Sequence, residues 1–228
     1  MRADALAFLL FTGVVLWFLH HRARAAIKQE RGAMFQPCLG LFDTYRVVQD
    51  DVYFPILTGR YGGVRVRLEP IADHVVMRKI PSLWLLVTIR EEVPFEGALD
   101  LLVRPQNVEF YSPSARLPVQ LEVPPGWPQP AWLRSDDPER MPPLSLIARH
   151  IGFFDDPKAK ELVVTPKGVR LVYQVNQSVR AHYMVLRQAH FENLALSPER
   201  LQDLLDRAVA LWEDLRKEGA RRGLVAAK

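Results

Sequence analysis

Apolar and polar positions follow three patterns along this 228-residue chain: a continuous apolar run near the start, period-two alternation in the middle and helical spacing at the end. Residues 64–68 (VRVRL) alternate strictly, which is typical of a half-buried strand. Residues 83–89 (LWLLVTI) are apolar almost throughout, which favours a central strand buried on both faces. Gly59, Gly62 and Gly63 precede the first of these strands and predict a tight reversal.

A hairpin is the clearest local prediction. Residues 161–165 and 169–175 flank Pro166-Lys167-Gly168, where proline presets the turn and glycine accepts a positive φ. Arg170 and Gln174 fall on the polar face of its second strand. Further short strands are predicted over residues 53–57, 98–103, 107–111 and 179–186, the last of them beside the hairpin.

Helical spacing appears twice in the second half of the chain. Residues 144–153 place their apolar side chains on one face. The closing helix has Ser197 as N-cap, Pro198 at the first helical position and Gly219 as C-cap. Its apolar stripe, which we expect to cover one face of the sheet, consists of Leu201, Leu204, Leu205, Ala208, Leu211, Trp212 and Leu215.

The segment 113–143 is rich in proline and predicts a long, partly extended loop, because proline lacks the amide donor that regular structure needs. Within it, Pro125, Trp127, Pro128 and Trp132 accompany a P-x-x-P spacing that is compatible with polyproline II. One interpretation is a loop that binds a protein partner. The alternative is a structural loop that seals the sheet.

Together these elements predict an α+β fold. It comprises one N-terminal transmembrane helix, a mainly antiparallel sheet domain and a C-terminal amphipathic helix packed on the sheet. The predicted organisation is a membrane anchor with a basic juxtamembrane helix over residues 1–32, a linker over 33–40, a cytoplasmic domain over 41–219 and a basic tail over 220–228.

The anchor prediction rests on residues 5–19, which are uncharged. As a helix they extend about 22 Å, which is short against a hydrocarbon core of about 30 Å. Flanking side chains can extend the anchor into the interface; they are Trp17, His20, His21, Arg22, Arg24 and Lys28. One alternative is a cleaved signal peptide, for which Ala23-Arg24-Ala25 matches a cleavage pattern but the cations follow the apolar run instead of preceding it. The other alternative is a helix that lies in the membrane–water interface.

The same cations predict an orientation, because flanking Lys and Arg favour the cytoplasmic side of a membrane. We therefore expect the N-terminus outside and the domain in the cytoplasm, which in bacteria means an inner-membrane protein. Cys38, the single cysteine, agrees with a reducing compartment and excludes an internal disulfide framework or a multi-cysteine zinc site.

Composition narrows the possible functions. Hydrophobic residues make up 49% of the chain, which excludes general disorder. The net charge is +4, but most of it belongs to the juxtamembrane stretch, and the chain from residue 32 onward carries only +1. A near-neutral domain lacks the basic footprint of a nucleic-acid-binding protein. The partners we expect are the lipid bilayer and a protein that the sequence does not identify.

Candidate chemistry is sparse. Arg60, Arg65 and Arg67 surround the predicted reversal, and the last two project from one side of a strand as an anion-binding face or as an ordinary solvated face. The sequence contains neither a G-x-S-x-G nor an H-E-x-x-H pattern, so no catalytic residue, metal ligand or cofactor is predicted.

The leading hypothesis is a membrane-tethered, non-enzymatic interaction or scaffold protein. The alternative is a single-span accessory subunit of a larger membrane protein complex, in which Thr12-Gly13 would allow close helix contact. A third is a membrane-bound enzyme whose site has no recognisable motif.

Overall fold

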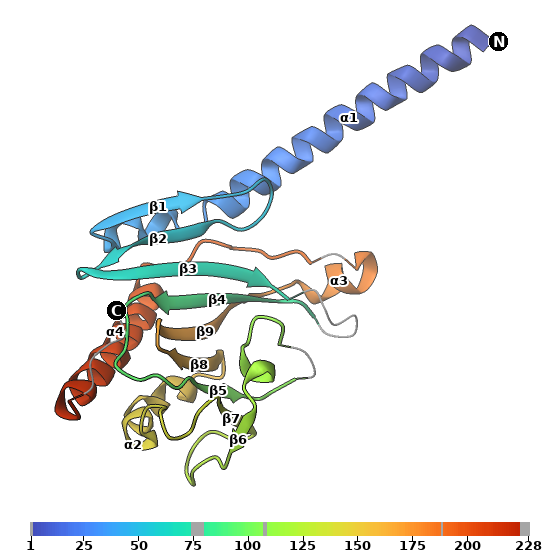
Figure 1. The fold of residues 1–228 in the computed structure, drawn as a ribbon. Coiled ribbons are helices and arrows are strands. Elements are labelled where there is room, and N and C mark those ends of the chain that lie inside the picture. The colour runs from blue at the N-terminus through green and yellow to red at the C-terminus, as the bar shows by residue number, and fades with distance from the viewer. Residues whose placement is uncertain (1, 74–79, 107–108, 188, 224–228) are drawn as a thin grey trace.

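A nine-stranded sheet organises the chain, with its strands in the order β1-β2-β3-β4-β9-β8-β5-β7-β6 (Figure 1). All neighbouring strands are antiparallel. This computed structural model describes residues 2–73, 80–106, 109–187 and 189–223, with the side chains of 2–7 and 186 outside the description. The predicted α+β class with a mainly antiparallel sheet is confirmed.

The strands are β1 (Thr44–Val48), β2 (Ile56–Tyr61), β3 (Val64–Ala72), β4 (Ser82–Ile89), β5 (Leu99–Val103), β6 (Val119–Leu121), β7 (Ala131–Ser135), β8 (Ala159–Thr165) and β9 (Gly168–Gln177). The α-helices are α1 (Arg2–Gly32), α2 (Leu144–Ile147), α3 (Arg180–Leu186) and α4 (Pro198–Arg221). Three 3₁₀ helices join them: η1 (Gln36–Leu41), η2 (Ser114–Arg116) and η3 (Ala148–Asp155).

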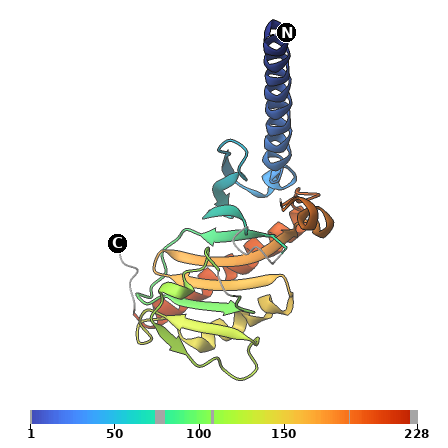
Figure 2. The same cartoon turned by 90° about the vertical axis from the view of Figure 1, so that its right-hand side faces the viewer.

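One face of the sheet packs against α4, which runs behind the strands in Figure 2. The Ser197 hydroxyl accepts a hydrogen bond from the Arg200 N–H at 3.1 Å, as expected of the N-cap. Most of the predicted stripe is buried, namely Leu201, Leu204, Leu205, Ala208, Leu211 and Leu215. Trp212 is only half-buried, and its Nε1 donates to the carbonyl of Glu92 at 3.2 Å.

Gly219 differs from its predicted role as a C-cap. It lies within α4, where it is buried against Pro94, and an added Cβ would stand 1.9 Å from the proline Cγ. The helix needs glycine here for close packing, and it continues to Arg221.

The strand predicted over residues 179–186 is α3 instead. The predicted hairpin itself forms as β8 and β9, but its two outer edges already pair with β5 and β4. No edge remains beside it for another strand. The chain therefore leaves the sheet after Gln177 and turns into a short helix, in which the Tyr183 N–H donates to the Val179 carbonyl.

Other predictions also differ from the structure in detail. Residues 113–143 are not all loop, because they contain η2, β6 and β7. The helix predicted over 144–153 is one α-helical turn followed by η3. Of the strand predicted over 107–111, residues 107 and 108 lie outside the described residues, and the chain turns at 110 and 111.

The segment expected as a linker, 33–40, carries core side chains. Met34, Phe35 and Cys38 are all buried, and the Cys38 thiol donates to the carbonyl of Leu196 at 3.3 Å. Burial raises the pKa of the Cys38 thiol to about 11. The chain is thus anchored to the core directly after α1.

Helix α1 leaves the body of the protein as a projecting arm (Figures 1 and 2). Only its last turns are held: Gln49 Nε2 donates to the Lys28 carbonyl at 2.9 Å, and Arg31 Nη1 donates to the Val52 carbonyl at 2.7 Å. Arg31 also lies 4.8 Å above the ring of Phe54. Among the described residues, no helix combines the length and the apolar character that crossing a membrane requires.

Candidate functional site

The face of the sheet opposite α4 carries a row of mostly polar residues. Strand pairing aligns Arg67 with Thr88, Thr88 with Arg170, Arg170 with Val163, and Val163 with Asp100. Their sequence neighbours belong to the core on the α4 side, so alternation places this row on the other face. Residues from five strands therefore meet on a surface that α4 does not cover.

A groove of about 460 Å³ occupies this face. Five of its lining side chains are cationic, and none of the described residues that line it is a carboxylate, a histidine or a cysteine. The lining consists of Arg67, Thr88, Arg90, Pro113, Arg116, Val163, Thr165, Lys167, Gly168, Val169 and Arg170. We call this hollow the basic groove.

The basic groove has a half-buried floor and an exposed rim. Arg67, Thr88 and Arg170 form the polar part of the floor, where Arg170 Nε donates to the Thr88 hydroxyl at 3.3 Å. Arg90, Arg116 and Lys167 stand exposed at the rim. A ligand in the groove would therefore meet positive charge from below and from its sides.

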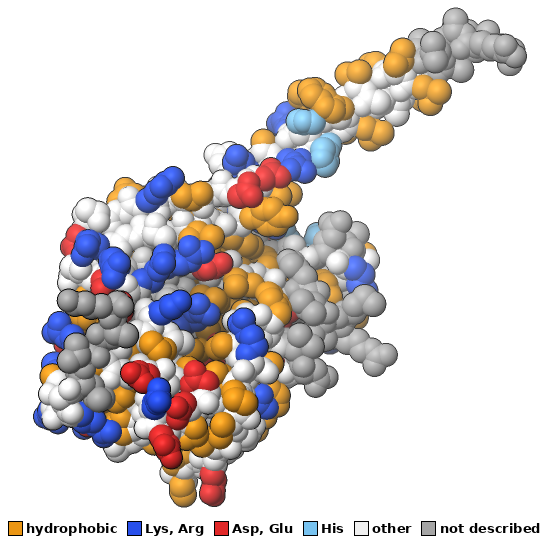
Figure 3. Space-filling view, in the orientation of Figure 1, with side chains coloured by type: hydrophobic (Ala, Val, Ile, Leu, Met, Phe, Trp, Pro, Cys, Tyr) orange, Lys and Arg blue, Asp and Glu red, His pale blue; other side chains and the backbone are white. Residues whose placement is uncertain are grey.

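Most of this charge is not neutralised. Across the described part of the chain, only one groove cation forms a salt bridge: Arg67, whose Nη2 lies 3.0 Å from Glu69 Oε2. Some arginines elsewhere on the sheet and helices are paired, such as Arg65 with Glu91 and Arg207 with Asp203. Figure 3 shows Lys and Arg side chains gathered across the half of this face that carries β1 to β4.

Local backbone features shape the walls. Gly168 has φ of 139°, and an added Cβ would lie 1.9 Å from the carbonyl oxygen of Ile89, so only glycine lets the β8–β9 turn approach β4 this closely. On the opposite wall, Arg134 Nη1 donates to the Ser114 carbonyl at 3.1 Å and holds η2 against the sheet. That contact positions Arg116 at the rim.

Two buried carboxyl groups adjoin the groove. Asp100 on β5 and Glu161 on β8 are both fully buried, and their carboxyl oxygens have no hydrogen-bond partner among the described residues. Burial raises the pKa of Asp100 to about 7. Burial, together with the charge of Asp100, raises the pKa of Glu161 well above its ordinary value. The pair therefore retains protons near neutral pH.

The arrangement is suited to binding an anion. Arginine forks and threonine hydroxyls donate hydrogen bonds to oxyanions, and half-buried cations attract them more strongly than fully solvated ones. Among the residues described, no group of three or more His, Cys, Asp or Glu side chains is placed to hold a metal ion.

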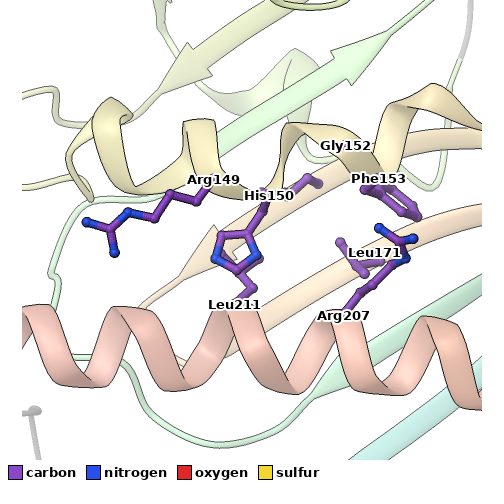
Figure 4. Close-up of a pocket in the computed structure, with 8 residues that line it drawn as sticks. Arg149, His150, Gly152, Phe153, Leu171, Arg207 and Leu211 are labelled. Atoms are coloured by element: carbon purple, nitrogen blue, oxygen red, sulfur yellow. The ribbon is translucent and has the colours of Figure 1, made fainter.

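A second hollow, between η3 and α4, is much smaller at about 80 Å³ (Figure 4). His150 points from η3 toward α4, and its Nε2 lies 3.3 Å from Asp214 Oδ2. Burial lowers the pKa of His150. The size of the hollow and its apolar neighbours Phe153 and Leu211 indicate a packing contact between two helices.

Of the arginines predicted to form an anion-binding face, the structure places only Arg67 in the basic groove. Arg60 donates to the Gly63 carbonyl at 2.7 Å, and Arg65 makes two 2.9 Å hydrogen bonds to Glu91. The other four cations of the groove were not predicted as site residues. For one of them, Arg170, the sequence did carry a signal, because it lies on the polar face of the predicted hairpin.

The predicted partner-binding loop is divided between different environments. Trp127 packs half-buried against the core, and Trp132 lies on β7 with the Arg134 guanidinium 4.9 Å from its ring centre. Pro125 is exposed and Pro128 is half-buried.

The predicted interface residues all lie on the exposed surface of α1: Trp17, His20, His21, Arg22, Arg24 and Lys28. Two of them make side-chain hydrogen bonds. His21 Nδ1 lies 3.0 Å from the Trp17 carbonyl oxygen, and Arg24 pairs with Asp51.

Comparisons with known proteins found little. No family model and no curated protein matches the chain. One solved structure that resembles it is that of the mycobacterial trehalose monomycolate transport factor A, TtfA. It is 14% identical, with a TM-score of 0.42 over 90% of this chain and 99% of the other. A likeness this weak does not establish a shared fold.

Proposed function

We propose that this protein is a membrane-tethered, non-enzymatic binding or scaffold protein, in which α1 is the tether and the sheet domain presents the binding surface. The observation that carries the proposal is the surface of α1. Nine large apolar side chains of α1 are more than half exposed: Phe8, Leu9, Leu10, Phe11, Val14, Leu16, Trp17, Phe18 and Leu19. An uncovered apolar surface of this kind favours contact with lipid.

The distribution of these side chains favours lipid over a protein groove. Successive helical residues project about 100° apart, so the continuous run from Phe8 to Phe11 surrounds the helix instead of forming one stripe. A single docking groove would cover only one side of such a helix, whereas a bilayer covers all of them.

The orientation follows from the charges beside the run. Trp17, His20 and His21 suit the headgroup region, and Arg22, Arg24 and Lys28 favour the cytoplasmic side. The proposal therefore places the sheet domain in the cytoplasm. The described lining of the basic groove, which offers cations but no carboxylate, histidine or cysteine, favours binding over catalysis.

Fractionation of cells that express the full chain tests the tether. We expect the protein in the membrane pellet after a high-salt wash, which removes proteins held by charge alone. We also expect it there after alkaline carbonate, which releases proteins that are not inserted. Recovery in the supernatant of the carbonate wash would contradict the proposal.

A second candidate is an accessory subunit of a larger membrane complex. It is favoured by Gly13, because a Cβ added there would meet nothing within 4 Å, so that another helix has room to approach the backbone. Native sizing after mild detergent extraction separates the two functions. A fixed assembly with other proteins favours the subunit, whereas a protein that runs alone favours the tethered binding protein.

A further inference from the structure

We propose that the basic groove binds a small ligand that carries two or more negative charges on phosphate groups. This inference rests on the proposed binding role, for which it names the ligand class, but it does not require the membrane tether. The ligand meets Arg67 and Arg170 at the floor and Arg90, Arg116 and Lys167 at the rim.

Positive charge is concentrated locally in the basic groove. The chain from residue 32 onward carries a net charge of only +1, yet five cationic side chains line one groove and no carboxylate of the described residues does. Four of the five form no salt bridge within the described ranges of the chain. Like charges held together repel each other, so a bound anion would relieve an unfavourable arrangement.

The cations of the basic groove come from separate segments that converge on one space. Arg67 and Arg90 belong to β3 and to the end of β4, Lys167 and Arg170 to the β8–β9 turn and β9, and Arg116 to η2. A solvated strand face would present its arginines along one line. Here they surround a hollow of about 460 Å³, which is within the usual range of small-molecule sites of about 300–1,000 Å³.

The number of donors in the groove favours phosphate over a single carboxylate. A phosphomonoester carries about −1.5 to −2 charges near pH 7 and three acceptor oxygens. Four arginine forks, one ammonium and the hydroxyl of Thr88 supply many more donors than one carboxylate can accept. Two phosphate groups, or one phosphate beside another anionic group, match this donor set.

The groove is a short hollow, which limits the length of the ligand. At one margin Glu69 pairs with Arg67. A nucleic acid strand needs a continuous basic track, whereas this groove offers one enclosed set of cations. A soluble phosphate compound and a phosphorylated lipid headgroup share the chemistry that fits.

Calorimetric titration of the full chain in neutral detergent micelles tests the proposal, with pyrophosphate as the soluble probe. A second titration uses the same micelles doped with phosphatidic acid as the lipid probe. Binding of pyrophosphate alone assigns a soluble ligand. Binding of phosphatidic acid, with displacement of pyrophosphate, assigns a headgroup.

Variants locate the binding. In Lys167→Gln/Arg116→Gln, which changes two exposed rim residues, we expect the dissociation constant to rise at least about tenfold. In Arg170→Gln, which changes a residue of the groove floor, we expect a similar rise in the dissociation constant. The matched control is Arg207→Gln, which removes one positive charge from the exposed side of α4.

Three results would overturn the proposal. One is that neither probe binds the wild-type chain. Another is that Arg207→Gln weakens binding as much as the rim variant does. The last is that the rim variant keeps its wild-type melting temperature and still binds with unchanged affinity. None of these results depends on carbonate extraction, so failure of the ligand proposal and failure of the tether are separate outcomes.

Discussion

Arg170 on β9 donates from Nε to the hydroxyl of Thr88 on β4 at 3.3 Å, and the two residues lie directly opposite each other in the antiparallel ladder. The hydrogen bond holds the guanidinium along the floor of the basic groove. Strand pairing places Arg67 on the other side of Thr88, so one threonine separates two arginines from different strands. Both guanidinium groups therefore border the same groove, where Arg67 also pairs with Glu69.

Gly168→Ala tests the packing that shapes the groove. Because a Cβ at this position would lie 1.9 Å from the Ile89 carbonyl oxygen and φ is 139°, we expect a loss of about 2–4 kcal/mol in the free energy of unfolding. Chemical denaturation measures it. Gly40→Ala is the control, since a Cβ there meets nothing within 4 Å and we expect a change below about 1 kcal/mol. Equal effects at both positions would contradict the account of Gly168.

The buried carboxyl pair predicts that stability falls as the pH rises. A group whose pKa is raised by folding holds its proton more tightly in the folded state, so stability is greatest below its ordinary pKa and declines up to the folded pKa. For Asp100 that window runs from 3.8 to about 7. A tenfold change in a proton equilibrium is worth about 1.4 kcal/mol, so the loss over this window is on the order of a few kcal/mol.

Asp100→Asn removes the ionisable group while keeping its shape. We expect the variant to melt several degrees above wild type at pH 8 and to lose much of the decline between pH 4 and pH 7, since about 1 kcal/mol corresponds to about 2–4 °C in a chain of this size. Scanning calorimetry across this range measures both. Glu122→Gln, which changes an exposed carboxylate, serves as the control. If the decline of stability with pH persists in Asp100→Asn, the buried carboxyl pair is not its cause.

Substitutions along α4 should rank by burial. Leu205 is fully buried, and Leu205→Ala is expected to cost about 3–5 kcal/mol. Trp212 is half-buried with its indole N–H bonded to Glu92, so Trp212→Ala should cost less, about 1–3 kcal/mol. Urea denaturation gives both values. A larger loss for Trp212→Ala would mean that its ring contributes more to the core than its exposure indicates.

The cations after the apolar run predict the orientation in a bacterial host. A reporter that is active only in the periplasm, fused after Lys228, should stay inactive, and one that is active only in the cytoplasm should be active. Replacing Arg22, Arg24 and Lys28 with Gln should weaken this preference, because flanking Lys and Arg set it. Strong periplasmic activity of the wild-type fusion would reverse the proposed orientation.

Elements defined by local signals were predictable from the sequence. The β8–β9 hairpin has a two-residue turn between alternating strands, and α4 has a proline, a serine cap and a regular apolar stripe. Strand β1 lacks such a signal: all five of its residues are exposed, so no burial pattern marks it. Residues 179–186 have strand-forming composition, but the sheet has no free edge beside β9.

The basic groove depends on information that the sequence does not carry locally. Arg67 was predicted as part of an anion-binding face because it lies on an alternating strand. Its approach to Arg170 depends on β4 pairing with both β3 and β9 in one particular register. Arg116 reaches the groove through η2, within a segment whose prolines predicted only a loop. Such long-range pairing explains why one arginine of the groove was predicted and its partners were not.

Flotation of the purified full chain with phosphatidylcholine vesicles tests the proposed tether most directly, because these neutral lipids isolate apolar insertion from charge attraction. We predict that the wild-type chain and Leu10→Val/Leu16→Val rise with the vesicles. Leu10→Arg/Leu16→Arg, which places two charges on the exposed apolar part of α1, should remain at the bottom of the gradient. A wild-type chain that stays at the bottom, or a double arginine variant that floats equally well, would contradict the proposal that α1 holds this protein in a membrane.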